Sequence, residues 1–329
     1  MSRPRVSVVV PTHNRHERLA ATLAAVLGQE GREETEVLVV DDGSDDETPR
    51  VVAALAGSGV SYLHQPHGGA SAARNRGARA AHGALLLFVD DDVELLPDAV
   101  AALVEAHRAF PHAVVVGHLF SPEPANRYEW LGVLPDRETA AGINPVDCTE
   151  CLTGLLAVGR EQFLALDGFE DPTGGWPSWD DVDFGYRAQR AGLQLLRTSE
   201  AQGIHHDESA TSLAATARRW QAASESAVRL FARHPDLRGA FPFYRDKLPI
   251  AWGSDPATLV ARKLARGAVS SRPALRVTRP LADLSVRGSW PGGIARPLCG
   301  CVVSGSMWQG LRRGIEASGR EGRDSGGVS

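Results

Sequence analysis

The chain has 329 residues, of which 43% are hydrophobic and 23% charged, and its formal net charge is −5 at pH 7. This composition is ordinary for a globular protein and argues against a disordered chain. The apolar runs are far shorter than the roughly 20 residues that a membrane-spanning helix needs. The first residues show no charged leader, apolar stretch and cleavage site in order, so a cytoplasmic protein is predicted.

The first half of the chain alternates between strand and helix patterns. A β-branched strand over 6–10 precedes a helix that Asn14 can cap, and Ser71 can cap a later helix over 72–81. The other predicted elements are strands at 37–40, 60–63 and 84–89 and helices at 48–56 and 99–110. This alternation predicts an α/β fold with a doubly wound, mostly parallel sheet. Ligands bind such sheets beyond the carboxyl ends of the strands.

Three consecutive carboxylates, Asp90, Asp91 and Asp92, follow the apolar strand at 84–89. Their mutual repulsion disfavours ionisation unless a positive charge neutralises them. A hard divalent cation such as Mg²⁺ or Mn²⁺ would do so, because these ions prefer oxygen ligands. The alternative is a solvated turn or the beginning of the next helix, where acidic side chains are favoured.

The pattern weakens beyond about residue 120. A loop region rich in proline and tryptophan contains an apolar segment at 152–158, and helices are predicted from about Trp179 and over 212–234. Past Pro235 only short helical pieces are predicted, and residues 319–329 read as a disordered end. We therefore predict a domain over 1–210, with halves at 1–118 and 119–210, and a helical extension over 211–318.

Charge and cysteine are unevenly distributed. Residues 256–329 hold twelve Lys/Arg and four Asp/Glu, a net charge of +8, so residues 1–255 carry −13. The basic region could contact an anionic membrane at its inner face, or it could simply be a solvated tail. The cysteines form two close pairs, Cys148 with Cys151 and Cys299 with Cys301. Ordinary thiols are favoured over a metal or redox site, because the spacings match no zinc module.

Six segments in order resemble the family 2 glycosyltransferases, which have the nucleotide-sugar-binding GT-A fold. They are Val-Ser-Val-Val-Val-Pro-Thr-His-Asn-Arg (6–15), Val-Leu-Val-Val-Asp-Asp-Gly-Ser-Asp-Asp (37–46), Gly-Ala-Ser-Ala-Ala-Arg-Asn-Arg-Gly (69–77), Leu-Phe-Val-Asp-Asp-Asp-Val (87–93), Thr-Gly-Leu-Leu-Ala-Val (153–158) and Trp-Asp-Asp-Val-Asp-Phe-Gly-Tyr-Arg (179–187). The resemblance covers about residues 1–210. The last segment is most similar to the galactofuranosyl- and rhamnosyltransferase branches.

The resemblance implies a donor site at the strand ends. Asp41 or Asp42 would accept the imide N–H of uracil or thymine, and Arg74 would reach the base or the diphosphate. Turn formation is the alternative role for the two aspartates. The implied donor-binding residues are Pro11, Thr12, Asn14, Asp41, Asp42, Arg74, Asp90 and Asp91.

The resemblance also implies a metal ion, either Mn²⁺ or Mg²⁺. Asp90 and Asp92 correspond to the Asp-x-Asp motif of the family, and His205 stands where related enzymes have a histidine that joins the metal. Asp91 is the weakest candidate ligand of the three aspartates, because it points to the other side of an extended chain.

For the chemical step, the resemblance places the general base at Asp181, with Asp180 as the rival. Capping of the following helix and an Asp183–Arg187 pair are alternative roles for these acids. Trp176 and Trp179, with Gly154, are the candidate acceptor-binding residues. Tryptophans of such a loop region could equally fill a small core.

These inferences predict a metal-dependent, inverting glycosyltransferase that moves a sugar from a UDP- or dTDP-sugar to a glycan, lipid or small-molecule hydroxyl. A nucleotidyltransferase that forms nucleotide sugars is one alternative, but it would carry a lysine-containing phosphate loop near the first strand. The chain has only two lysines, Lys247 and Lys263. An inactive sugar- or nucleotide-binding module is the other alternative. No nucleic-acid partner is expected, and a homodimer is left open.

Overall fold

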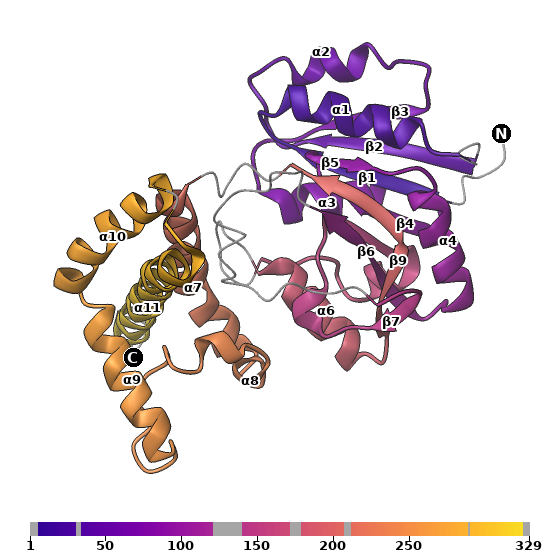
Figure 1. Ribbon diagram of the computed structural model, residues 1–329. Helices are drawn as coiled ribbons and strands as arrows, with labels where there is room; N and C mark the ends of the chain where they lie inside the picture. Colours follow the sequence, from indigo (N-terminus) through magenta and orange to yellow (C-terminus); the bar gives the residue numbers. More distant parts are fainter. Residues whose placement is uncertain are drawn as a thin grey trace. The chain divides into compact units, whose positions relative to one another are not determined.

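The computed structural model describes residues 6–30, 34–120, 140–171, 179–206, 212–288 and 290–324 (Figure 1). It divides into two compact units. The N-terminal unit contains the described residues up to 206 except Trp179, and the helical unit contains Trp179 and the described residues from 212 onward. Apart from Trp179, the division of the described residues falls between residues 206 and 212, and the domain bounds expected from the sequence stay a prediction.

The N-terminal unit is built on one sheet. Strands β1 (Val6–Thr12), β2 (Thr35–Asp41), β3 (Val60–His64) and β4 (Leu85–Val89) pair in parallel in the order β3-β2-β1-β4. The sheet continues through β8 (Leu155–Gly159), β6 (Ala113–Phe120), β9 (Gln194–His205) and β5 (Val93–Leu95), and β7 (Ile143–Pro145) pairs with β9. Strands β6 and β9 are parallel, whereas β8, β5 and β7 join antiparallel.

Helices cover both faces of this sheet, because successive strand side chains point to opposite sides. Val8 and Val10 join the buried cluster that includes side chains of α1 (His16–Leu27) and α4 (Ala99–Ala109). Val9 faces the other side, where α3 (Ala70–Ala80) lies so close that a Cβ on Gly77 would come within 2.4 Å of the Val9 side chain. On that side Phe88 packs with Phe163 of α5 (Arg160–Ala165) and with Phe169 of the loop that follows. Both of these rings pack in turn with Phe184 of α6 (Asp180–Arg190). The predicted α/β fold with a doubly wound sheet is confirmed.

Two predicted helix caps are wrong. Helix α1 begins after Arg15, with no side-chain cap, and Asn14 has a φ of 53°. Asn14 instead links the loops that follow β1 and β2, because its N–H donates to Ser44 and its side-chain oxygen accepts from the Asp45 N–H. Helix α3 begins at Ala70, one residue before Ser71. Tertiary hydrogen bonds take the place of both expected caps.

The helical unit contains longer helices than the sequence suggested. The predicted helix over 212–234 is confirmed as α7 (Leu213–Arg233), which Ser212 caps. It is followed by α8 (Leu237–Ala240), α9 (Ala257–Val269), α10 (Arg272–Arg287) and α11 (Gly292–Asp324). Helix α11 packs on α7 through glycines, since a Cβ on Gly310 or Gly314 would lie 2.0 or 2.4 Å from an α7 carbonyl oxygen. The prediction of short pieces past Pro235 was wrong, and residues 319–324 belong to α11 instead of a disordered end.

Candidate functional site

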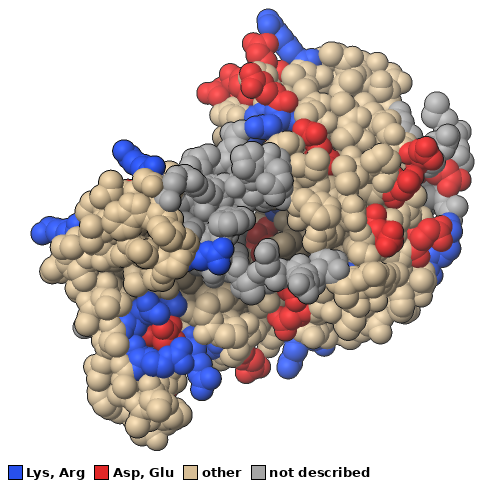
Figure 2. All heavy atoms as spheres, viewed as in Figure 1, with Lys and Arg blue, Asp and Glu red and all other residues tan. Residues whose placement is uncertain are grey.

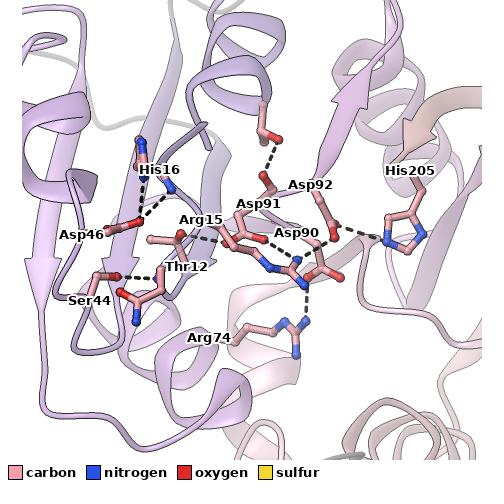
Figure 3. A network of polar contacts seen from close by, with 12 residues as sticks. Thr12, Arg15, His16, Ser44, Asp46, Arg74, Asp90, Asp91, Asp92 and His205 are labelled. Atoms are coloured by element: carbon pink, nitrogen blue, oxygen red, sulfur yellow. Dashed lines mark hydrogen bonds and ion pairs between the residues drawn. The ribbon is translucent and has the colours of Figure 1, made fainter. Parts of the chain in front are cut away.

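The carboxyl ends of β1, β2 and β4 bring the predicted polar residues together. Thr12 and Asp41 are register partners at the ends of β1 and β2, and the acidic triplet Asp90–Asp92 follows β4 beside them. The Thr12 hydroxyl donates to Asp91 at 2.8 Å. Figure 3 shows the triplet at the centre of a network of hydrogen bonds and ion pairs. These side chains therefore lie together beyond the carboxyl ends of the strands, as the sequence predicts.

Arg15, at the beginning of α1, neutralises part of the triplet. Its Nη1 lies 3.2 Å from Asp91 Oδ1 and 2.7 Å from Asp92 Oδ2 (Figure 3). Asp92 Oδ1 also lies 3.2 Å from His205 Nε2. The structure thus brings together two of the three expected metal ligands. Burial alone would raise the pKa of Asp92, but His205 and Arg15 outweigh it and hold that pKa below its usual range.

Asp91 behaves differently from its neighbour. Its side chain is buried, and burial is the main reason why its pKa rises to about 6, although Arg15 and Thr12 act against that rise. The neighbouring charges of Asp92 and Asp90 raise it further. Asp91 therefore ties the triplet to β1 and α1. The expected alternation of an extended chain does not apply here, because residues 90–92 form a turn in which the Val93 N–H donates to the Asp90 carbonyl at 3.2 Å, and Asp91 and Asp92 contact the same Nη1 of Arg15.

Arg74 joins the triplet to α6. Its buried guanidinium lies 2.6 Å from Asp90 Oδ1 and 3.2 Å from Asp180 Oδ2. Ser71, one turn earlier on α3, donates to the same Asp180 oxygen at 2.7 Å. Within the described residues, the Nε atom of Arg74 is buried and has no hydrogen-bond partner. Arg74 and Ser71 thus fix the beginning of α6 against the edge of the sheet.

Asp181 is the half-buried neighbour of Asp180 in the first turn of α6. Burial, followed by the charge of Asp180, raises its pKa above the usual range of a carboxyl group. Its own carboxylate accepts a hydrogen bond from the Val182 N–H at 2.8 Å. Asp90 and Arg74 are close enough to act on its charge. Asp181 is therefore a carboxyl group of raised basicity beside the acidic triplet.

Asp41 and Asp42 are both buried and receive several hydrogen bonds. Asp42 accepts from the N–H groups of Gly68 and Gly69 at 2.9 and 2.8 Å, and from the Gln65 amide at 2.6 Å. Asp41 accepts from the Ser44 N–H at 2.8 Å and from the Tyr62 hydroxyl. Each carboxylate has about four acceptor positions, so Asp41 keeps capacity for a further donor.

The remaining predicted residues fall in three places. Pro11 lies in β1, and the Gly154 carbonyl accepts the Asp90 N–H at 3.3 Å, so Gly154 lies directly beside the triplet. Trp179 belongs to the helical unit, where its indole N–H donates to the Ala223 carbonyl at 2.9 Å and its ring packs on Phe241. Trp176 lies outside the described residues.

The donor chemistry of the triplet fits a hard divalent cation. Asp90 and Asp92 offer carboxylate oxygens and His205 an imidazole nitrogen, a combination that suits Mn²⁺ or Mg²⁺. In the described part of the chain, however, no three such side chains are gathered closely enough to form a ready metal site. The physical reason is that Arg74 holds Asp90 while Arg15 holds Asp92. A cation would have to displace these guanidinium groups.

Cys148 and Cys151 are free thiols in the segment that packs against α6. A Cβ on Gly185 would lie 2.7 Å from the Cys151 Cβ, so this glycine permits close contact. Burial, with the charge of Asp147, raises the pKa of the Cys148 thiol to about 12, and burial likewise raises that of Cys151. Thiols of this kind are unreactive packing groups at neutral pH.

Sequence reasoning missed four residues that organise the site, namely Arg15, Tyr62, Gln65 and Ser71. A basic residue at the first strand end, opposite three consecutive acids, was an available signal for Arg15. The partners of the other three lie on separate elements, and no short-range pattern indicates them.

Known proteins resemble this chain in sequence and in fold. Residues 7–150 match the profile of the Glycosyl transferase family 2. This part of the chain belongs to that family. The validoxylamine A glucosyltransferase of Streptomyces hygroscopicus subsp. limoneus is 29% identical over 233 residues, which are 61% of this chain and 51% of the relative. The chain thus spans about half the length of that relative.

A shorter match links the chain to the GalNAc(5)-diNAcBac-PP-undecaprenol β-1,3-glucosyltransferase of Campylobacter jejuni. It is 34% identical over 118 residues, which are 33% of this chain and 37% of the relative.

Solved structures show the same GT-A fold. A mannosyltransferase from Pyrobaculum calidifontis, in complex with GDP-Man and Mn²⁺, superposes with a TM-score of 0.60 at 20% identity and covers 94% of this chain and 88% of its own. The Staphylococcus aureus protein TarS, in complex with UDP-GlcNAc, superposes with a TM-score of 0.57 at 17% identity, covering 97% and 92%.

Proposed function

We propose that the protein transfers a sugar from a nucleotide-sugar donor to an acceptor hydroxyl, with inversion at the anomeric carbon. One observation supports this most strongly. Arg74 bridges Asp90, at the end of β4, and Asp180, at the beginning of α6, and thereby places the raised-pKa group Asp181 beside the acidic triplet. A diphosphate-binding edge and a candidate base thus belong to one connected network.

The nucleoside of the donor would bind at the ends of β1 and β2. Asp41 would accept an imide N–H of the base, because its carboxylate is held by Ser44 and Tyr62 and retains an acceptor position. The Pro11–Thr12 backbone would lie alongside. We keep UDP and dTDP as the expected carriers. GDP belongs in the same test, since the mannosyltransferase with a similar fold was solved with GDP-Man.

The diphosphate would bind at the triplet with a divalent cation. Asp90, Asp92 and His205 would hold Mn²⁺ or Mg²⁺, and such an ion stabilises the negative charge of a leaving nucleoside diphosphate. Two of the solved proteins of similar fold contain Mn²⁺. Arg15 and Arg74, once released from the aspartates, are suited to bind phosphate oxygens through their forked donors.

Asp181 would be the general base. As the acceptor oxygen forms its bond to the anomeric carbon, Asp181 takes the hydroxyl proton, and the bond between that carbon and the phosphate oxygen breaks. A surface carboxylate is a poor proton acceptor near neutral pH, and burial beside Asp180 makes Asp181 a better one. Asp180 is already bound to Arg74 and Ser71, which favours Asp181 for this role. The acceptor could be a glycan, a lipid or a small molecule.

A thermal-shift panel of UDP, dTDP and GDP, each with Mn²⁺ or with EDTA, tests this function. The proposal expects one of the nucleotides to raise the melting temperature only when Mn²⁺ is present, because metal and diphosphate bind together. The matched nucleoside monophosphate is the control and should give a smaller shift. A protein stabilised by none of them, or equally in EDTA, would contradict the proposal.

A further inference from the structure

Helix α10 (Arg272–Arg287) has three distinct faces. Leu275, Ala282 and Val286 are buried, and Leu275 packs so closely on α11 that a Cβ on Gly305 would lie 2.8 Å from its side chain. A second face is apolar but exposed: Val277 is 63%, Leu281 42% and Leu284 53% exposed. The exposed residues of α10 also include two prolines and four arginines, namely Pro273, Pro280, Arg272, Arg276, Arg279 and Arg287.

The exposed apolar residues form one continuous stripe. With about 100° between successive residues, the three aliphatic side chains and the two prolines fall within an arc of about 100°. The four arginines fall within about 80° along one side of this stripe, together with the single acid Asp283. The third arc is the buried face. The helix therefore has more apolar surface than its packing on α11 uses, bordered by a basic edge.

This arrangement points to a specific partner. A single exposed aliphatic side chain is normal, but a continuous stripe of three such side chains along one helix is typical of an interaction site. Among the described residues no helix is long and apolar enough to span a membrane. A helix with an exposed apolar face and an arginine edge instead lies in the plane of a bilayer, where the apolar side chains enter the headgroup region and the arginines meet anionic lipids.

We propose that α10 is an interfacial helix that binds the protein to an anionic lipid surface. Charge favours lipid over a second copy of this chain. The region from residue 256 onward carries a net charge of +8, so two such surfaces would repel each other, whereas anionic headgroups attract it. Figure 2 shows lysine and arginine side chains spread over the visible face of the helical unit. Binding of this kind would determine where the protein acts, and it requires neither the metal ion nor the general base.

Vesicle sedimentation of the full chain tests the proposal. Wild-type protein should pellet with vesicles of phosphatidylcholine containing about 30% phosphatidylglycerol, bind weakly to phosphatidylcholine alone, and lose binding between about 0.1 M and about 0.5 M salt. The triple variant Val277→Ser, Leu281→Ser, Leu284→Ser should lose about tenfold or more of the affinity. The variant Arg276→Gln, Arg279→Gln should lose about tenfold on anionic vesicles only.

A matched control removes exposed apolar side chains elsewhere. The variant Phe110→Ser, Ile143→Ser, Ile315→Ser changes three residues that are each 38% exposed, and it should bind vesicles as the wild type does. Far-ultraviolet circular dichroism confirms that each variant is folded. Equal binding of the wild type and the α10 triple variant would overturn the proposal. So would a wild-type dimer that the triple variant converts to a monomer, because the stripe would then be a contact between copies.

Discussion

The acidic triplet of the N-terminal unit and helix α10 of the helical unit use charge in opposite ways. In the N-terminal unit, the side chains of Asp91, Asp92 and Asp180 are buried at one edge of the sheet. Arg15 forms ion pairs with the first two, and Arg74 forms one with Asp180. In the helical unit the arginines of α10 lie on the surface beside an exposed apolar stripe. A ligand that binds at buried, paired charges must replace their partners, whereas exposed charges mainly attract partners of opposite sign. This difference agrees with the two proposals that the N-terminal unit carries out the reaction and that the helical unit binds the protein to a lipid surface.

The sharpest test of this division removes one acid from each unit. Asp92→Ala should abolish turnover, by about a thousandfold or more, because it removes a proposed cation ligand that also holds His205 and Arg15. Asp236→Asn, in the helical unit, should leave turnover within about twofold. Both are measured by product formation from a radiolabelled nucleotide sugar. Normal turnover of the Asp92 variant would remove the triplet from the mechanism.

The next effect concerns the proposed base. Asp181→Asn should reduce turnover about a hundredfold or more while donor affinity stays close to that of the wild type. The wild-type rate should rise with pH as Asp181 loses its proton, and this rise should lie above the pH range of an ordinary aspartate because the pKa is raised. The variant should lack it. Steady-state kinetics across pH check both points, and an unchanged rate would move the base elsewhere.

The free energy of unfolding should depend on pH through the buried carboxyl group of Asp91. Its folded pKa of about 6 lies above that of an unfolded aspartate, so the native state holds the proton more tightly. The free energy of unfolding that this proton contributes is therefore present at low pH and is lost as pH rises from about 4 to about 6. Relative to wild type, Asp91→Asn should gain about 2 to 3 kcal/mol across this window and stay constant above it. Urea unfolding in EDTA measures the difference. A difference that does not change with pH would contradict the assignment.

The smallest expected effect is the release of the acidic triplet from Arg15. Because this half-exposed guanidinium competes with a cation for Asp92, Arg15→Gln should bind Mn²⁺ alone up to about fivefold more tightly. The same variant should bind the nucleoside diphosphate less tightly, since a phosphate-binding group is lost. Opposite changes are not expected from a purely structural role. Calorimetric titration measures both, with the exposed Arg50→Gln variant as control.

Features of the fold and the site that depend on neighbouring residues could be predicted from the sequence, whereas those that depend on contacts between distant residues could not. The parallel strands and the acidic triplet were predicted because apolar runs and the acids that end them are local patterns. The caps at Asn14 and Ser71 were wrong because tertiary partners, the Asp45 N–H and the Asp180 carboxylate, bind these side chains. Helix α11 was missed because its glycines lower helix propensity, yet those glycines allow it to pack on α7. The bridge from Arg74 to Asp90 and Asp180 joins residues 16 and 106 positions apart, which no spacing rule predicts.

We propose that a cation at the acidic triplet binds the diphosphate of a sugar donor. Paramagnetic resonance of Mn²⁺ tests it most directly, because the signal of the free ion disappears on binding. UDP, dTDP or GDP should tighten Mn²⁺ binding to the wild type, and the Asp92→Ala variant should bind neither the ion nor the nucleotide. Equal nucleotide binding with and without Mn²⁺, or unchanged Mn²⁺ binding by the Asp92 variant, would contradict it.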